Sequence, residues 1–555
     1  MTSAFDLLIA GATVYDGLGN PGRRVDIAVR DGRIAAIGSD LGPARERVVA
    51  DGLVLMPGII DVHTHYDAQI TWDAHLTPSP ALGVTTAILG NCGFGIAPCP
   101  PHLRETMMKN LSVVEGMDLD ALVTGTQWGF ESFPQYLDFI ESRHPSLNVG
   151  VFIGHSAIRT AVMGTQAAQR AIPTPTEMTR MRDAVRDAMN AGAIGFASSF
   201  SPNHFGFQGS PMPSTIASDD ELRELVDTMA ESGRGVFMMA TGPRATPEFM
   251  ESMAQSTGRP MFASTVLTMY NEAKPEVSAD MYERAAAALS RGHEVYLQTT
   301  CQPLSFNFTL LDPYLLLSHD AFDRIAGLDA AGLRSIYADP TFRERFRFNL
   351  ANPARGILFF GDWSKIETSE GATVSELAVA AGVDPLDHFF DLALDRGLET
   401  PFVAKLFQNH DAGVAPLLKH PAGIITLSDA GAHLVYFCDA GFGPYLLSHW
   451  VRDTGTFTLE EAIRRLTSDP ADKFRIVDRG RLIEGAWADM VLFDPASIDR
   501  GELRRVADLP GGGTRMVREA DGLHGVWVNG VLVHDGRDYA ALARGPGQVM
   551  REYAV

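Results

Sequence analysis

The chain has 555 residues, a length that suits three or four domains or one large α/β barrel with attachments. Hydrophobic residues make up 45% and charged residues 21%, which is the composition of a folded protein and excludes a disordered or low-complexity chain. The formal net charge of −22 repels phosphate backbones and anionic lipids, so neither nucleic acid nor membrane is an expected partner.

The four cysteines are too few for a disulfide framework in so long a chain, and they indicate a reducing compartment. The first ten residues have no basic region, and Asp6 interrupts their apolar stretch, so they predict a first strand rather than a signal peptide. No run of about 18 apolar residues is present for a bilayer span. We therefore expect a cytoplasmic protein.

Short β-branched runs separated by Asp-Gly pairs occur at both ends of the chain. The pairs at Asp31-Gly32 and Asp51-Gly52 are matched by Asp535-Gly536, and such pairs are strong hairpin signals. We expect residues 1–57 and 476–555 to form one small composite β-sandwich domain. Two unrelated β caps are the alternative.

Between the two ends, short buried strands alternate with amphipathic helical stretches. Eight strands are expected, at residues 58–65, 85–92, 148–156, 194–200, 235–241, 260–267, 294–300 and 423–430. Repeated β-then-α units of this number predict an α/β fold with a (β/α)8 TIM barrel over residues 58–475. A doubly wound open sheet is the alternative, but no Gly-x-Gly-x-x-Gly follows a strand. A long insertion at about 301–422 is expected to build the substrate pocket or a lid.

The strongest chemical signal is an apolar strand that ends in His-x-His, the sequence Pro-Gly-Ile-Ile-Asp-Val-His-Thr-His at residues 57–65. Residues i and i+2 of a strand point the same way, so His63 and His65 should converge at the mouth of the barrel. Two convergent imidazoles suit a borderline metal such as zinc. A pair of core or surface histidines is the alternative.

This motif after a β-rich start resembles the amidohydrolase superfamily, metal-dependent barrels with a split β-sandwich. The later motifs are similar to its D-aminoacylase (N-acyl-D-amino-acid deacylase) branch and lie at residues 90–93, 154–159, 162–164, 428–430, 479–485 and 488–489. The resemblance implies that Cys92 is a zinc ligand, that Asp429 is both general base and metal contact, and that His63 and His65 belong to a second, weaker metal site.

The family pattern also places one metal-binding histidine on strand 5 and one on strand 6, and this sequence has neither. Strand 5 ends in Ala240 and Thr241, and strand 6 carries Ser264 and Thr265. The remaining ligands suit one zinc in N2SO geometry and are too few for two ions. They are His63, His65, Cys92 and Asp429. We expect one zinc per chain, with another divalent metal as an alternative. A helix-capping role is the alternative for Asp429.

Four further residues are candidates of lower weight. His155, at the end of strand 3, is a catalytic candidate that could polarise a carbonyl or join the metal, with a packing role as the alternative. His433 is a candidate substrate contact or replacement ligand, and Arg159 could pair with a substrate carboxylate or form an ordinary salt bridge. His204 follows strand 4, and the sequence favours a surface position for it.

These features predict a metal-dependent hydrolase of an amide or related C–N bond in a small molecule, such as an N-acyl amino acid. Two alternatives stay open. One is a non-hydrolytic metal-dependent reaction of decarboxylase or lyase type on the same barrel, and the other is a metal-free binding or scaffold relative. We also expect a homo-oligomer.

Overall fold

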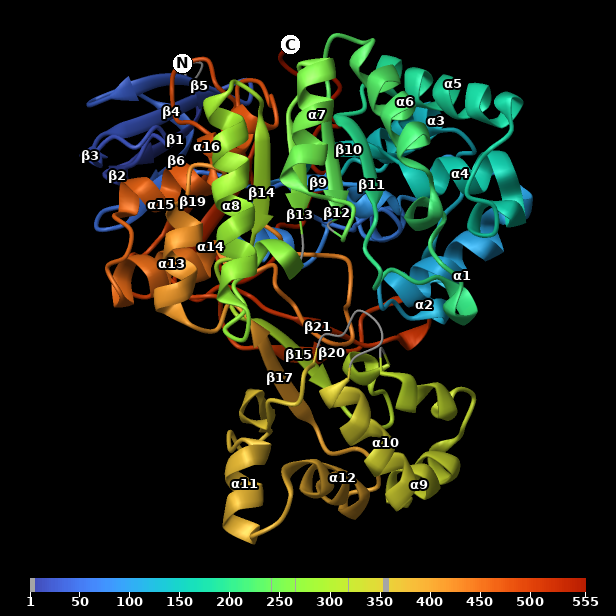
Figure 1. Ribbon diagram of the computed structural model, residues 1–555. Coiled ribbons are helices and arrows are strands. Elements are labelled where there is room, and N and C mark those ends of the chain that lie inside the picture. The colour runs from blue at the N-terminus through green and yellow to red at the C-terminus, as the bar shows by residue number, and fades with distance from the viewer. Residues whose placement is uncertain (1–4, 241, 265, 318, 353–358) are drawn as a thin grey trace.

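The fold is taken from a computed structural model that describes residues 5–240, 242–264, 266–317, 319–352 and 359–555. Three parts are visible in Figure 1: β-sheets from both chain ends, a central α/β unit, and a separate lobe below it. Within the described residues, no helix combines the length and the apolar character needed to cross a membrane.

The central unit contains one parallel sheet of eight strands in the order β18-β14-β13-β12-β11-β10-β9-β8. Its strands are β8 (Ile59–Asp61), β9 (Val84–Leu89), β10 (Asn148–Gly154), β11 (Gly195–Ser199), β12 (Val236–Ala240), β13 (Met261–Ser264), β14 (Val295–Thr299) and β18 (Gly423–Ile425). A parallel bridge joins Thr64 to Ala430, just beyond the ends of β8 and β18, so the first and last strands meet. All eight expected strands are present, in an arrangement consistent with a TIM-like barrel.

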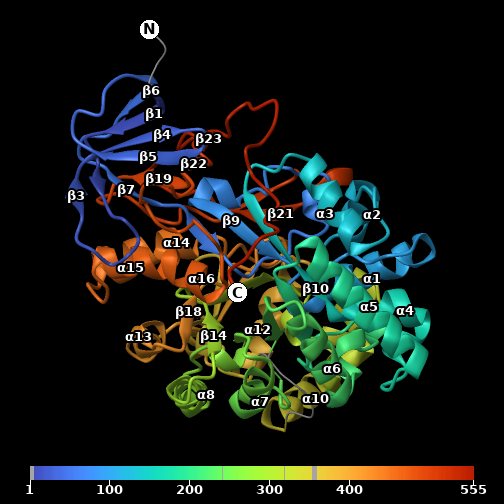
Figure 2. The same cartoon turned by 90° about the horizontal axis from the view of Figure 1, so that it is seen from above.

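Helices follow most of these strands and lie on the outer side of the sheet (Figure 2). They are α1 (Arg104–Val114), α2 (Leu119–Gly125), α3 (Phe133–Ser142), α4 (His155–Met163), α5 (Pro175–Ala191), α6 (Asp219–Ala230), α7 (Pro247–Thr257), α8 (Pro275–Ser290), α13 (Asp411–Lys419), α14 (Phe442–Tyr445), α15 (Leu459–Leu466) and α16 (Ser468–Lys473). The sequence explains α5 well. Thr174 and Glu177 form a capping box at its start, and Met181, Val185 and Met189 are buried at helical spacing.

Two β-sheets are built from the ends of the chain, one from the N-terminal segment alone and one from both segments. A four-stranded sheet contains β1 (Phe5–Ala10), β4 (Asp26–Arg30), β5 (Arg33–Gly38) and β6 (Ala44–Val49). A six-stranded sheet contains β2 (Thr13–Val14), β3 (Arg23–Arg24), β7 (Val54–Pro57), β19 (Met490–Phe493), β22 (Leu523–Val528) and β23 (Val531–His534). Leu7 and Ile27 from the first sheet share one hydrophobic core with Leu55, Met490 and Trp527 from the second.

The C-terminal segment also contacts the central unit at two places. The hairpin of β20 (Arg504–Val506) and β21 (Arg515–Val517) lies beside the loop after β18, where the Met516 N–H donates to the Leu434 carbonyl at 2.7 Å. At the other end of the sheet, Val549 forms a bridge with Val149 of β10. Residues 476–555 are thus not confined to the terminal sheets.

The expected long insertion between β14 and β18 forms the lobe at the bottom of Figure 1. It contains β15 (Leu304–Phe308), α9 (Ala330–Ala338), α10 (Pro340–Ala351), β16 (Ile366–Thr368), α11 (Val374–Ala381), α12 (Pro385–Asp395) and β17 (Phe402–Phe407). The lobe has its own aromatic core, which includes Phe322, Phe342 and Phe390. Leu427, Tyr436 and Phe437 from the loop after β18 join this core, so the lobe packs against the carboxyl end of the parallel sheet.

Candidate metal centre

His63 and His65 lie just beyond β8 on an extended segment that continues to pair with its neighbours. The His65 N–H donates to the Ala430 carbonyl at 2.7 Å, and the Thr64 N–H donates to the Ile88 carbonyl at 3.1 Å. Alternation along this segment sends both imidazoles to the same side, where their ring centroids are 5.3 Å apart. Both side chains are buried.

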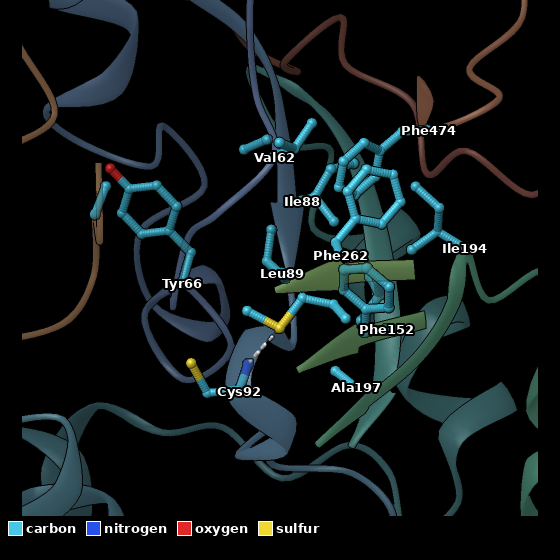
Figure 3. Close-up of a cluster of buried hydrophobic side chains, with 14 of the residues drawn as sticks. Val62, Tyr66, Ile88, Leu89, Cys92, Phe152, Ile194, Ala197, Phe262 and Phe474 are labelled. Atoms are coloured by element: carbon cyan, nitrogen blue, oxygen red, sulfur yellow. Dashed lines mark hydrogen bonds between the residues drawn. The ribbon is translucent and has the colours of Figure 1, made fainter. Parts of the chain in front are cut away.

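Cys92 and Asp429 reach the same place from turns with unusual backbone conformations. Cys92 follows β9 with φ of 55°, and Asp429 follows β18 with φ of 50°, both in the left-handed region that residues with a side chain rarely adopt. Such strained conformations cluster at functional sites. Gly431 makes the second turn possible, because a β-carbon there would lie 2.6 Å from the His65 carbonyl. Figure 3 shows Cys92 at the edge of the apolar side chains, including Phe152 and Phe262, that fill the centre of the sheet.

The potential ligand atoms of His63, His65 and Cys92 all lie within 4.8 Å of one another. His63 Nε2 is 3.7 Å from Cys92 Sγ and 3.4 Å from Asp429 Oδ1, and His65 Nε2 is 3.2 Å from the same oxygen. Tetrahedral zinc with ordinary bond lengths separates a nitrogen ligand from an oxygen by about 3.4 Å and from a sulfur by about 3.6 Å. Three donor distances therefore match edges of a zinc tetrahedron, while the group whose ligand atoms all lie within 4.8 Å of one another consists of His63, His65 and Cys92 without Asp429.

Each imidazole has a polar neighbour at Nδ1, which leaves Nε2 facing the other donors. The Nδ1 atom of His63 is 2.7 Å from Gln298 Oε1 on β14, and the Nδ1 atom of His65 is 3.1 Å from Glu115 Oε1. A histidine that gives Nδ1–H to an oxygen acceptor keeps its lone pair on Nε2, the form that binds a metal. The Gln298 contact has hydrogen-bond geometry, whereas Glu115 acts on His65 as a buried carboxylate at ion-pair distance.

Burial and charge act in opposite directions on the ionisable groups of this cluster. Burial lowers the pKa of His63 to about 4 and raises the pKa of the Cys92 thiol to about 11. For His65, the lowering by burial is outweighed by Glu115 and Asp429, which raise its pKa well above the ordinary value. A metal that binds here has to displace protons from Cys92 and His65.

Asp429 stays ionised at neutral pH. Burial acts to raise its pKa, but His65, His63 and His433 hold the pKa well below the usual range for a carboxyl. Its Oδ1 faces the two ligand histidines, whereas Oδ2 is 4.0 Å from His433 Nε2. One oxygen is thus available to a metal and the other to a proton.

A cavity of about 100 Å³ lies beside the cluster. Its polar side is lined by His65, Cys92, Glu115, Ser201, Asn203, His204, Asp429 and His433, and its apolar side by Phe94, Val114, Met269, Leu304, Phe306, Tyr314, Leu427 and Phe437. Leu304, Phe306 and Tyr314 come from the lobe, so the insertion contributes directly to the wall of the pocket.

The ends of β12 and β13 carry no metal ligand among the described residues. Ala240 ends β12 and Ser264 ends β13, and both are buried. Thr241 and Thr265 lie outside the described residues. In the described part of the chain, His63, His65 and Cys92 form the single group of three such ligands that come this close together.

The structure places His155 and Arg159 in a different environment from the cavity. His155 Nδ1 is 2.8 Å from Ser198 Oγ and its Nε2 is 2.9 Å from Glu221 Oε1, while Arg159 donates to Glu221 Oε2. Arg159 also donates to the Arg170 carbonyl at 2.6 Å. Apart from Arg159 Nε, their polar atoms have partners inside the protein, so these two candidates form a buried network and do not line the described cavity wall.

One cavity residue, Glu115, was not identified from the sequence, and a second, His204, was expected at the surface rather than in the site. Glu115 follows α1 in the long connection between β9 and β10, where no pattern marks it as a neighbour of His65. His204, for which the sequence favours the surface, lines the cavity with Nδ1 2.6 Å from Ser199 Oγ. His433 lines the cavity beside Asp429, and its role as a substrate contact stays a prediction.

Known proteins match this chain along almost its whole length. The amidohydrolase family matches residues 48–295 and 362–534. A D-aminoacylase of Alcaligenes xylosoxydans xylosoxydans is 31% identical over 542 residues, which cover 95% of this chain and 94% of the relative. The crystal structure of an N-acyl-D-glutamate deacylase from Bordetella bronchiseptica, with zinc and a phosphonate inhibitor, has a TM-score of 0.67 and 27% identity over 99% of this chain and all of that one.

A second solved structure bears on the number of metals. A D-aminoacylase with a binuclear metal centre, activated by one metal and attenuated by a second, has a TM-score of 0.67 and 25% identity, covering 99% of this chain and 100% of that chain. The family match, the D-aminoacylase relative and the donor geometry agree with one another. The chain belongs to the amidohydrolase family and is a metal-dependent C–N bond hydrolase of its D-aminoacylase-like branch.

Proposed function

We propose that this protein is a mononuclear zinc hydrolase that cleaves the amide C–N bond of a small N-acyl compound, such as an N-acyl amino acid. The observation that carries the proposal is the convergence of His63, His65 and Cys92, whose ligand atoms lie within 4.8 Å of one another, with Asp429 Oδ1 beside both imidazoles at 3.4 Å and 3.2 Å. The names of the D-aminoacylase and N-acyl-D-glutamate deacylase relatives support the substrate class.

A single ion is supported by what lies at the ends of β12 and β13. Ala240 offers no ligand atom there, and the Ser264 hydroxyl is buried without a hydrogen-bond partner in the described part of the chain. The donors that do converge come from the segments after β8, β9 and β18 and serve one ion. Zinc held by them supplies Lewis acidity and makes water a usable nucleophile near neutral pH.

The protein's own contribution to the reaction is proton transfer at Asp429. Its carboxylate is ionised, and Oδ2 lies on the side of His433 and the cavity. Asp429 takes a proton as the water oxygen attacks the acyl carbon, and it returns the proton to the nitrogen as the C–N bond breaks. The apolar lobe residues Phe306 and Tyr314 exclude bulk water from this side of the cavity.

We further propose that the two terminal sheets act as one sandwich domain that supports the barrel over residues 58–475. Asp489, next to β19, accepts from the Asn148 side chain at the start of β10 at 3.2 Å, and its carbonyl accepts from the Gly58 N–H at 2.8 Å. Arg479 and the Asn529 N–H also donate to the Asp489 carboxylate. This buried cluster ties the terminal segments to the strands that carry the ligands.

The test is the Asp429→Asn variant, which keeps the shape of the side chain and removes its charge. We expect turnover of a panel of N-acyl-D- and N-acyl-L-amino acids to fall by about 10²–10⁴-fold, with zinc content reduced only modestly. Asp439→Asn is the matched control on the same loop, because burial raises the pKa of Asp439 to about 7 and much of that carboxyl is already neutral.

Zinc content, melting temperature and turnover measured on one preparation separate the possible roles of Asp429. Loss of zinc together with activity would make it chiefly a ligand. A lower melting temperature with normal turnover per folded molecule would make it a structural cap, and near-normal turnover would contradict the proposed catalytic role.

A further inference from the structure

The two ligand histidines are supported by partners of different charge. His63 Nδ1 is 2.7 Å from the neutral side-chain amide of Gln298, whereas His65 Nδ1 is 3.1 Å from the carboxylate of Glu115. Both partners are buried, and the Glu115 side chain is only 5% exposed. A buried carboxylate is costly unless something compensates for its charge, so its presence behind one imidazole calls for an explanation.

Glu115 is delivered by a close contact between two loops. It follows α1, and its backbone carbonyl accepts from the His433 N–H at 2.5 Å. The next residue, Gly116, has φ of 53°, and a β-carbon there would lie 3.0 Å from the Tyr436 ring and 3.2 Å from His433 Nδ1. The connection between β9 and β10 is therefore seated against the loop after β18, with the Glu115 carboxylate directed at His65.

We propose that Glu115 is a positioning residue of the metal centre, whose carboxylate orients His65 as an Nε2 ligand and strengthens its bond to the metal. The inference rests on the proposed function and deepens it. A carboxylate 3.1 Å from Nδ1 favours the Nδ1–H tautomer through its charge and raises the electron density at the ligand nitrogen.

Glu115 acts through His65 and is not itself a ligand. Its Oε1 lies beside Nδ1, on the opposite side of the imidazole ring from the Nε2 that faces Asp429. Its negative charge favours a nearby cation, because charges interact strongly where water is excluded. In this chain, where β12 and β13 end in Ala240 and Ser264, this contact is one way to hold a single ion firmly with few direct ligands.

The experiment measures zinc affinity by competition with a chromophoric chelator, using the full chain freed of metal and then titrated with zinc alone. We expect Glu115→Gln to weaken zinc binding by about 10–100-fold, the usual loss when the partner of a ligand histidine is removed. Glu115→Asp keeps the charge one methylene away and should recover part of the affinity.

Glu105→Gln is the matched control, since it makes the same chemical change on α1. Glu105 is exposed, pairs with Lys109 at 2.7 Å, and should leave the zinc dissociation constant within about twofold of wild type. Gly116→Ala is the second variant, because it keeps the carboxylate but pushes the segment away from Tyr436. We expect it to weaken zinc binding too, even if Glu115→Gln proves too unstable to measure.

The outcomes separate this inference from the proposed function. Equal zinc affinity in wild type, Glu115→Gln and Gly116→Ala would overturn the positioning role and leave the metal site standing. A wild-type protein that binds no zinc would overturn the proposed function itself. A purely structural role would lower the melting temperature of Glu115→Gln without changing its zinc dissociation constant, and that result would also overturn the inference.

Discussion

Two buried clusters on the same sheet pair imidazoles with carboxylates, and they differ in what their polar atoms contact. Around His155 every pairing is made within the protein: one ring nitrogen meets Ser198, the other meets Glu221, and the second Glu221 oxygen accepts from Arg159. The Arg159 side chain is completely buried. This cluster is closed: its charges are paired inside the protein, and of the Arg159 nitrogens only Nε has no partner in the described part of the chain.

The cluster around His63 is open, because its potential metal-binding atoms face one another and a cavity. His63 Nε2 is 3.7 Å from the Cys92 sulfur, the Nε2 atoms of His63 and His65 are 3.4 Å and 3.2 Å from one Asp429 oxygen, and a cavity lies beside them. Acceptor lone pairs that converge in this way repel one another unless protons or a cation lie between them. The comparison teaches that residue type and burial do not identify a metal site, whereas donor atoms that converge beside a cavity do.

The largest effect on folding is expected in the closed cluster. Glu221→Gln leaves Arg159 buried without its anion, and we expect the free energy of unfolding in urea to fall by about 3–5 kcal/mol. Glu224→Gln on the same helix is the control, because Glu224 pairs with Arg182 at 2.9 Å while 44% exposed and should cost no more than about 1 kcal/mol. If the free energy of unfolding fell by a similar amount in both variants, the distinction between the closed and the open cluster would be wrong.

A smaller effect is expected in the pH dependence of stability. Burial lowers the pKa of His155, so the folded chain keeps it neutral in a pH range where the unfolded chain binds a proton, below about 6.5. The resulting stability is present above about pH 6.5 and is lost as the pH falls towards the folded pKa, at no more than about 1.4 kcal/mol per pH unit.

The check is urea unfolding of wild type and His155→Gln between about pH 7 and pH 5, each loaded with zinc. Wild type should lose stability more steeply on acidification than the variant, because the other titrating groups are common to both proteins. If stability changed equally with pH in both proteins, His155 would already carry a proton in the folded chain. The charges assigned to the closed cluster would then be wrong.

Much of the central sheet could be predicted from the sequence, because buried strands of three to seven residues alternate with helices that have one apolar face. The expected strand at 85–92 is shorter in the structure, where β9 ends at Leu89, since Gly90 and Cys92 turn the chain with positive φ. His63, His65, Cys92 and Asp429 converge because the carboxyl ends of parallel strands meet at one end of a barrel.

The rest of the site depends on partners that are distant in sequence. Arg159 and Glu221 are 62 residues apart, and Glu221 looks in the sequence like an ordinary acidic residue in the first turn of α6, after Ser218. Glu115 lies at the end of a helix inside a long connection, and only the seating of that connection against His433 brings it to His65. Neither pairing follows from a local pattern, because each depends on tertiary packing.

The central claim is that one metal ion binds where the donors of the open cluster converge. X-ray absorption at the zinc edge, together with the zinc content of wild type, His63→Ala and His155→Ala, tests it most directly. We predict one zinc per wild-type chain, with one sulfur at about 2.3 Å and nitrogen or oxygen ligands at about 2.0–2.2 Å. His63→Ala should lose most of the zinc and His155→Ala should keep it. Two zinc ions per chain, a shell without sulfur, or equal zinc loss in both variants would contradict the account.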